Sequence, residues 1–111
     1  MNEHDALSAL AALGQETRLA IFRLLVKAGD EGLAAGDVAH QLGVLQNTLS
    51  SHLKILSQAG LVTQEREGRV IRYRAGFLAM RDLLAFLMED CCNGNPELCS
   101  PVIEAVTCGC N

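Results

Sequence analysis

The sequence lacks the features that would mark a membrane or secreted protein. No apolar run reaches the roughly 18 residues that a membrane-spanning helix needs. The first five residues are partly acidic and lack the basic start and apolar run of a secretory signal peptide. The chain also has no internal repeat and no low-complexity tract. We therefore expect a cytoplasmic protein with no membrane contact, in a compartment where thiols stay reduced.

The number of cysteines is odd, and no histidine lies near them in the sequence. The chain has five cysteines, all after residue 90, so they cannot all pair in internal disulfides. In a reducing compartment such residues indicate metal ligands or redox sensors. A thiol enzyme needs a base beside its nucleophile, but His4, His40 and His52 lie far upstream. We therefore expect no enzyme and no organic cofactor, and keep a thiol metal-carrier protein as an alternative from another class.

A net positive charge is missing too, although the charge is unevenly distributed. The 111 residues carry a formal charge of −4, which by itself disfavours nucleic-acid binding. Residues 1–33 carry −2, residues 34–75 carry +2 and residues 76–111 carry −4. The middle third can therefore face an anionic partner, although a solvated basic face is the commoner explanation for so small an excess of positive charge.

Half of the residues are apolar, which is enough for one domain with a core. Apolar residues at helical spacing, each run ended by glycine, predict helices over 4–13, 15–28, 37–42 and 46–59. The expected buried stripe of the second helix is Leu19, Phe22, Leu25 and Val26. Residues 61–65 and 70–74 predict a β-hairpin with a turn at 66–69. The sequence also predicts a fifth helix, 77–90, that is apolar on nearly every face. Residues 93–111 contain Asn-Gly, Asn-Pro and Ser-Pro steps, which favour turns.

The third and fourth predicted helices are joined by Gly43, Val44 and Leu45, the short turn of a helix-turn-helix. The fourth helix has a leucine ridge on one face and short polar side chains on the other, as a DNA-reading helix requires. The candidate DNA contacts are Gln46, Asn47, Thr48, Ser50, Ser51, His52 and Lys54, with Arg69 and Arg72 on the hairpin. The alternative is that these are ordinary helix-capping residues in a protein that never touches DNA. A lone histidine such as His52 is also more often structural than a base contact.

One stretch resembles a known family. It reads Gln46-x-Thr48-x-Ser50-x-His52-Leu53-Lys54-x-Leu56-x-x-Ala59-Gly60-Leu61-Val62, followed by Arg66-Glu67-Gly68-Arg69-x-x-x-Tyr73 and preceded by Glu16-Thr17-Arg18-Leu19-x-Ile21-Phe22-x-Leu24-Leu25. These residues resemble the ArsR/SmtB metalloregulatory repressors over about residues 5–90. Leu45 departs from the family pattern, which often has serine or proline at that position.

The resemblance implies a mainly α fold with a small β-hairpin: a homodimeric winged helix-turn-helix that binds double-stranded operator DNA and leaves it when a metal or metalloid binds. It also implies that the first and fifth helices form the dimer interface, in agreement with the apolar fifth helix. The expected interface residues are Leu7, Leu10, Met80, Leu83, Leu84 and Leu87. We assign residues 1–90 to DNA binding and dimerisation, and residues 91–111 to a cysteine-rich metalloid-binding tail.

The sequence lacks two well-known sensing sites of the family, because residues 37–41 contain no cysteine and residues 77–90 contain no histidine. Six residues separate Cys92 of the Cys91-Cys92 pair from Cys99, and Gly94 and Pro96 allow the intervening loop to turn back. Three thiolates without histidine suit As(III) or Sb(III) better than zinc, which requires a fourth ligand. A subset of the family with such a Cys-Cys…Cys pattern responds to arsenite.

The last two cysteines, Cys108 and Cys110, leave the ligand set open. They are accessory ligands, part of a zinc or cadmium site with the other three, or spare thiols in a frayed tail. A redox-sensing role is a further alternative, since clustered exposed thiols oxidise readily.

Overall fold

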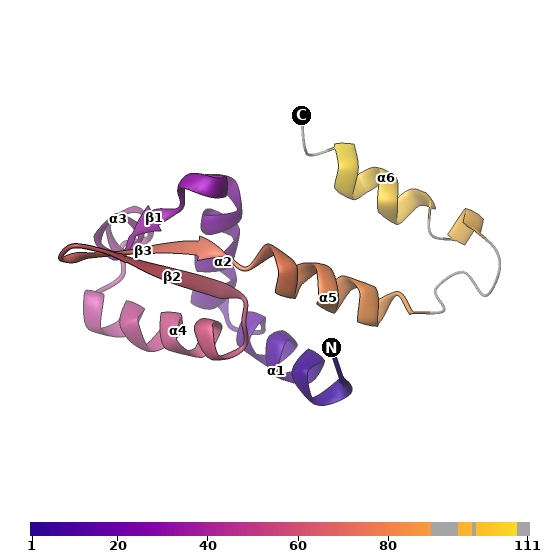
Figure 1. Cartoon of the computed structure of the whole chain (residues 1–111), viewed down its shortest axis with the longest axis horizontal. Coiled ribbons are helices and arrows are strands. Elements are labelled where there is room, and N and C mark those ends of the chain that lie inside the picture. Colours follow the sequence, from indigo (N-terminus) through magenta and orange to yellow (C-terminus); the bar gives the residue numbers. More distant parts are fainter. Residues whose placement is uncertain (90–95, 99, 109–111) are drawn as a thin grey trace.

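The computed structural model describes residues 1–89, 96–98 and 100–108. The elements are α1 (Glu3–Leu13), α2 (Glu16–Ala28), the 3-10 turn η1 (Gly29–Glu31), β1 (Leu33–Ala34), α3 (Ala35–Leu42), α4 (Gln46–Gln58), β2 (Val62–Glu67), β3 (Val70–Ala75), α5 (Phe77–Leu87), η2 (Pro96–Leu98) and α6 (Ser100–Cys108). Figure 1 shows α3 and α4 lying along the β2–β3 hairpin, and α5 leaving from the end of β3. The predicted winged helix-turn-helix of mainly helical composition is confirmed.

The structure differs from the sequence-based expectation in several elements, and α5 ends at Leu87 rather than at residue 90. β1 was not predicted, because a two-residue strand has no pattern of its own and exists only through pairing with β3. The hairpin strands are longer and its turn is shorter than expected, with Glu67 opposite Val70. The expectation of turns throughout 93–111 is wrong for 100–108, which form α6. Pro101 lies in the first turn of that helix, where a missing backbone N–H breaks no hydrogen bond.

The sheet is antiparallel, with strand order β1-β3-β2. Tyr73 on the central strand lies opposite Leu33 on one side and Gln64 on the other, and its side chain is buried. The far end of the β2–β3 hairpin forms the wing, and Arg69 and Val70 there line a hollow together with residues of α3 and with Gln46 of α4. The core therefore anchors the base of the wing and leaves the end of the wing exposed.

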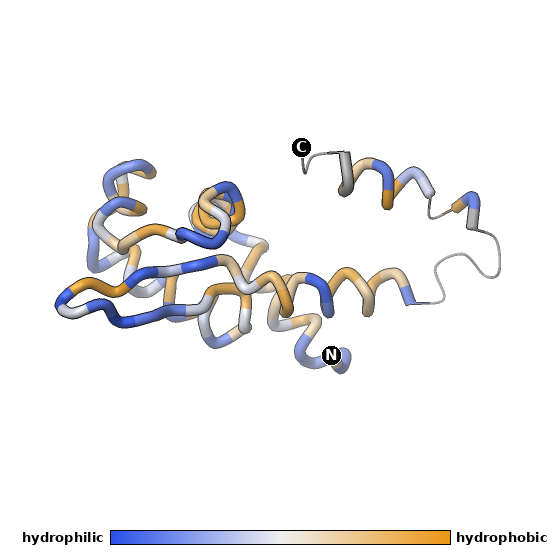
Figure 2. The backbone as a smooth tube through the Cα atoms, turned by 45° about the horizontal axis from the view of Figure 1, so that its top comes forward, coloured by the Kyte–Doolittle hydropathy of each residue, from blue (hydrophilic) through white to orange (hydrophobic). Residues whose placement is uncertain are grey.

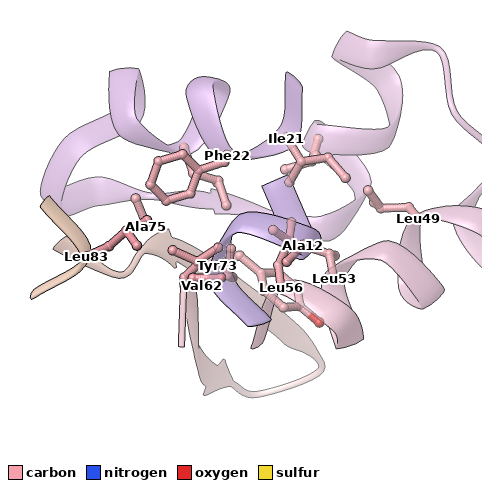
Figure 3. Close-up of a cluster of buried hydrophobic side chains, with 14 of the residues drawn as sticks. Ala12, Ile21, Phe22, Leu49, Leu53, Leu56, Val62, Tyr73, Ala75 and Leu83 are labelled. Atoms are coloured by element: carbon pink, nitrogen blue, oxygen red, sulfur yellow. The ribbon is translucent and has the colours of Figure 1, made fainter. Parts of the chain in front are cut away.

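The core lies between α1, α2, α4 and the sheet, as the close-up in Figure 3 shows. From α2, Ile21, Phe22 and Leu25 are buried. Leu19 and Val26, which were expected in this stripe, are 43% and 39% exposed, so that part of the prediction is wrong. α2 has apolar residues on more than one side, and packing against the other elements selects the side that is buried.

α1 buries alanines and exposes leucines. Ala6, Ala9 and Ala12 are at most 2% exposed, whereas Leu7 and Leu10 are 59% and 41% exposed. The small alanine side chains let α1 lie close to its neighbours α2, α4 and α5. Among the described residues, no helix has the length and apolarity to cross a membrane.

A close backbone approach fixes the junction at which α5 begins. The N–H of Gly76 donates a hydrogen bond to the carbonyl oxygen of Leu61 at 2.7 Å. A Cβ at residue 76 would lie 2.2 Å from the carbonyl oxygen of Gly60, closer than any real contact of this kind. Glycine at 76 is therefore required for α5 to leave the sheet at this point.

We expect Gly76→Ala to lower the free energy of unfolding by about 2 kcal/mol or more, because the backbone must shift to admit the methyl group. Gly36→Ala is the matched control. Gly36 lies within α3, and its nearest neighbour to an added Cβ is the Gln46 amide at 3.7 Å. The control should be neutral or raise stability by up to about 1 kcal/mol. Urea unfolding of both variants measures this, and equal stabilities would contradict the steric account.

Candidate nucleic-acid interface

The turn between α3 and α4 is set by backbone geometry. Gly43 ends α3 in the left-handed conformation at φ 64°, and its N–H points back to the last carbonyls of the helix. The N–H of Val44 donates to the carbonyl oxygen of Ala39 at 3.0 Å. Ala39 is 7% exposed and small enough for the two helices to approach. α4 therefore leaves the turn in a fixed direction.

The burial of three leucines orients α4. Leu49, Leu53 and Leu56 are at most 2% exposed, and they recur every three or four residues along one face. The rest of the helix surface is consequently exposed, and five of the predicted DNA contacts lie on it within the first two turns. These are Gln46, Asn47, Thr48, Ser50 and Ser51.

The two serine hydroxyls on this face already donate hydrogen bonds within the helix. The Ser50 Oγ donates to the carbonyl oxygen of Gln46 at 3.0 Å, and the Ser51 Oγ donates to that of Asn47 at 3.4 Å. A hydroxyl has one hydrogen to donate and two lone pairs to accept with. Each serine therefore presents lone pairs to the surface, and these suit the amino groups of cytosine and adenine.

His52 lies in a different environment from the other predicted contacts. It is half-buried, and its Nδ1 lies 3.4 Å from the guanidinium of Arg18 on α2. The same guanidinium donates through Nε to the carbonyl oxygen of Ala12 at 2.7 Å, in the last turn of α1. His52 thus belongs to a bridge joining α1, α2 and α4. This geometry fits a residue that positions α4, which was the structural alternative, whereas the sequence pattern had placed His52 among the candidate DNA contacts.

The basic residues around α4 and the wing differ in how freely they can meet an anion. Lys54 and Arg69 are exposed and make no hydrogen bond or ion pair with any other residue in the described part of the chain. Arg72 instead forms an ion pair with Glu67 at 2.9 Å and donates to the carbonyl oxygen of Glu31 at 3.2 Å. The Arg72 guanidinium holds the pKa of the Glu67 carboxyl below its usual value. Arg72 therefore has its charge compensated, whereas Arg69 does not.

A second surface is apolar and lies on α1 and α5. Of the residues expected in a dimer interface, Leu7, Leu10, Leu84 and Leu87 are 41% to 59% exposed, and Met80 is half-buried. Leu83 is only 2% exposed and packs in the core of its own chain, so its assignment to the interface is corrected. Phe77 and Leu78, which were not among the expected interface residues, are also exposed, at 47% and 69%. The apolar character of α5 is visible along its length in Figure 2.

The predicted metalloid ligands lie outside the described residues. This applies to Cys91, Cys92, Cys99 and Cys110, while Cys108 ends α6 with its side chain undescribed. Within the part of the chain that the structure describes, no group of three or more histidine, cysteine or acidic side chains is arranged to hold a metal ion.

Residues 13–65 match the family model described as a helix-turn-helix domain. The transcriptional repressor SdpR of Bacillus subtilis is 31% identical over 87 residues, which cover 78% of this chain and 93% of SdpR. The putative arsenical resistance operon repressor ArsR2 of Halobacterium salinarum is 39% identical over 62 residues, which cover 56% of this chain and 51% of ArsR2.

Two solved structures share the fold. An ArsR-like transcriptional regulator from Rhodococcus sp. RHA1 superposes with a TM-score of 0.71 at 29% identity, covering 93% of this chain and 92% of that one. The homodimeric winged helix-turn-helix DNA-binding domain of Mb0332 from Mycobacterium bovis superposes with a TM-score of 0.63 at 28% identity, covering 78% and 80%. On this evidence, together with the exposed polar face of α4 and its wing, the chain belongs to the ArsR/SmtB family of winged helix-turn-helix transcriptional repressors.

Proposed function

We propose that the chain represses transcription as a homodimer that inserts α4 into the major groove of operator DNA and releases the DNA when a trivalent metalloid binds its cysteines. The observation that carries the proposal is the polar face of α4, held outward by the buried leucine ridge. Its exposed amide side chains, Gln46 and Asn47, are of the type that hydrogen-bonds the adenine edge in the major groove.

Phosphate contacts come from the basic residues whose charge is uncompensated. Lys54 lies on the exposed side of α4, and Arg69 lies at the wing turn next to Gly68. Both are free to exchange condensed counterions for phosphate oxygens, which makes binding salt-dependent. The local excess of positive charge offsets the net charge of −4 at the surface that faces DNA.

Arg69→Ala should weaken binding to any duplex and flatten the plot of log affinity against log salt concentration by about one unit of slope. Arg72→Ala is the matched control, because Arg72 is already paired with Glu67. It should change the slope less. Fluorescence anisotropy across a salt series measures both slopes. A larger change in slope with Arg72→Ala than with Arg69→Ala would contradict the proposal, because it would show that Arg72 makes the phosphate contact.

The homodimer rests on the apolar surface of α1 and α5. Exposed leucines on both helices, together with Phe77 and Leu78, form an apolar patch that would be exposed to solvent in a monomer. Mb0332, which has the same fold, is a homodimer. Dimer symmetry then presents two α4 helices to two half-sites of the operator.

We expect Leu84→Glu to give monomers or insoluble protein, because a charge would replace an exposed leucine of the proposed interface, where dimerisation would bury it. Val70→Glu is the control: Val70 is comparably exposed, at 44%, but lies on the wing. That variant should remain dimeric. Analytical ultracentrifugation at micromolar concentration distinguishes the two, and a folded wild-type monomer would exclude this interface.

The inducer proposal rests on the cysteine pattern and on the similarity to ArsR2, a putative arsenical resistance repressor. Cys91, Cys92 and Cys99 supply the three thiolates that As(III) or Sb(III) takes in a pyramid. In the sequence, three residues separate Cys91 from the end of α5 at Leu87, and α5 is part of the proposed dimer surface. Gathering the three sulfurs would therefore favour a state of the dimer with lower affinity for DNA.

Cys99→Ser should bind operator normally but lose most of the release by arsenite, because two thiolates do not complete the ligand set. Wild-type protein should lose roughly 5- to 150-fold in affinity when arsenite binds, the usual range of such coupling. The control is the double variant Cys108→Ser with Cys110→Ser, which should keep the full response.

Titrating operator-bound protein with arsenite and monitoring fluorescence anisotropy measures how far each variant is released from the DNA. Full release with Cys99→Ser, or none with the double variant, would move the site to Cys108 and Cys110. If zinc, cadmium or an oxidant released the protein from the operator and arsenite did not, the inducer would not be a trivalent metalloid.

A further inference from the structure

Leu45 is the most exposed large apolar residue in the described part of the chain. Its side chain is 74% exposed, compared with 1% for Leu49 one turn along the same helix. An exposed leucine needs no explanation when its position is incidental. Leu45, however, is the N-cap of α4, directly before the polar residues of the recognition surface.

The backbone holds Leu45 in this position. The residue is extended, with φ −66° and ψ 143°, and its carbonyl oxygen accepts a hydrogen bond from the N–H of Leu49 at 2.8 Å. Val44 precedes it and packs against the core, with its own N–H bonded to Ala39. Since consecutive side chains of extended backbone point in opposite directions, Val44 points inward and Leu45 points outward.

Neither helix stability nor core packing accounts for leucine at this position. Leucine has no oxygen to accept hydrogen bonds from the free N–H groups of the first helical turn, and the structure shows no side-chain cap there. Serine, threonine, asparagine or aspartate at an N-cap would stabilise the helix by about 1 kcal/mol relative to a residue that cannot cap. The exposed side chain also contributes little burial in the free protein.

The surroundings of Leu45 favour DNA as the group that covers it. The next three residues, Gln46 to Thr48, are exposed and polar. Gln46 also lines a hollow of about 360 Å³ together with Arg69 and Val70 of the wing and Asp37 of α3. Leu45 therefore lies at the end of α4 that is closest to both the base-contacting face and the uncompensated charge of the wing. The one apolar group that DNA presents in its major groove is the C5-methyl of thymine.

We propose that Leu45 contacts the C5-methyl group of one thymine in each half-site and thereby selects that base. The proposal rests on the proposed DNA-binding function and adds to it a specificity-determining residue. The contact removes both the leucine side chain and the methyl group from water, which stabilises the complex only when thymine is present. Cytosine and uracil lack the methyl group and gain nothing from the leucine.

The experiment replaces thymine with deoxyuridine, which removes the methyl group and keeps the base pair. An operator duplex is first selected from random sequences with the wild-type dimer. Each symmetry-related pair of thymines is then replaced in turn, and binding is measured by fluorescence anisotropy. At one pair, wild-type affinity should fall about fourfold per half-site, the value expected for one buried methyl group. Leu45→Ala should bind the thymine duplex more weakly and show no change on replacement at that pair.

Two further variants separate this contact from other effects. Leu45→Ser restores a capping hydroxyl, so it should fold at least as stably and still be insensitive to the methyl group. Arg69→Ala should bind more weakly overall and keep the full sensitivity to deoxyuridine, because it changes a phosphate contact alone.

Equal responses of wild-type protein and Leu45→Ala at every thymine would overturn this inference while leaving DNA binding established. A smaller oligomer for Leu45→Ala in ultracentrifugation would also overturn it, because the leucine would then contact a second copy of the chain. A wild-type protein that retains no duplex would overturn the proposed function itself.

Discussion

The burial of three leucines on α4 is the constraint on which the rest of the interface depends. Leu49, Leu53 and Leu56 fix the rotation of the helix about its axis, because turning any of them outward would expose a large apolar side chain to water. The polar residues between them are consequently exposed. The same burial anchors α4 against β2 of the wing and against α1, so this packing sets the position of α4 relative to both elements.

A chain of polar contacts connects this helix to α1. Arg18 bonds the carbonyl oxygen of Ala12 at the end of α1 and approaches His52 on α4. α1 in turn packs against α5, whose start is fixed by the close backbone approach at Gly76. In the proposed mechanism, a ligand held just beyond α5 acts on the dimer surface, and these contacts join that surface to the DNA-reading helix. The effect can be no larger than the difference in ligand affinity between the two states.

Sequence patterns predicted the elements whose signals are local. The leucine spacing of α4, the terminating glycines and the hairpin alternation each gave an element close to its observed bounds. What depended on packing was harder to predict. The pattern could not show that α1 buries its alanines rather than its leucines, that Leu83 belongs to the core, or that β1 exists through pairing alone. For the interface, residue type indicated both Arg69 and Arg72, but the ion pair that compensates Arg72 is a tertiary contact without a sequence signal. His52 was likewise predicted from its neighbours on α4, whereas its partner, Arg18, lies 34 residues away.

The central claim is that a dimer places two α4 helices in successive major grooves, and methylation protection on the selected operator tests it directly. Dimethyl sulfate modifies guanine N7 in the major groove and adenine N3 in the minor groove. The account predicts two symmetric clusters of guanine protection whose centres lie about 10 base pairs, or a multiple of that, apart. A single cluster, or protection confined to adenine N3, would contradict it.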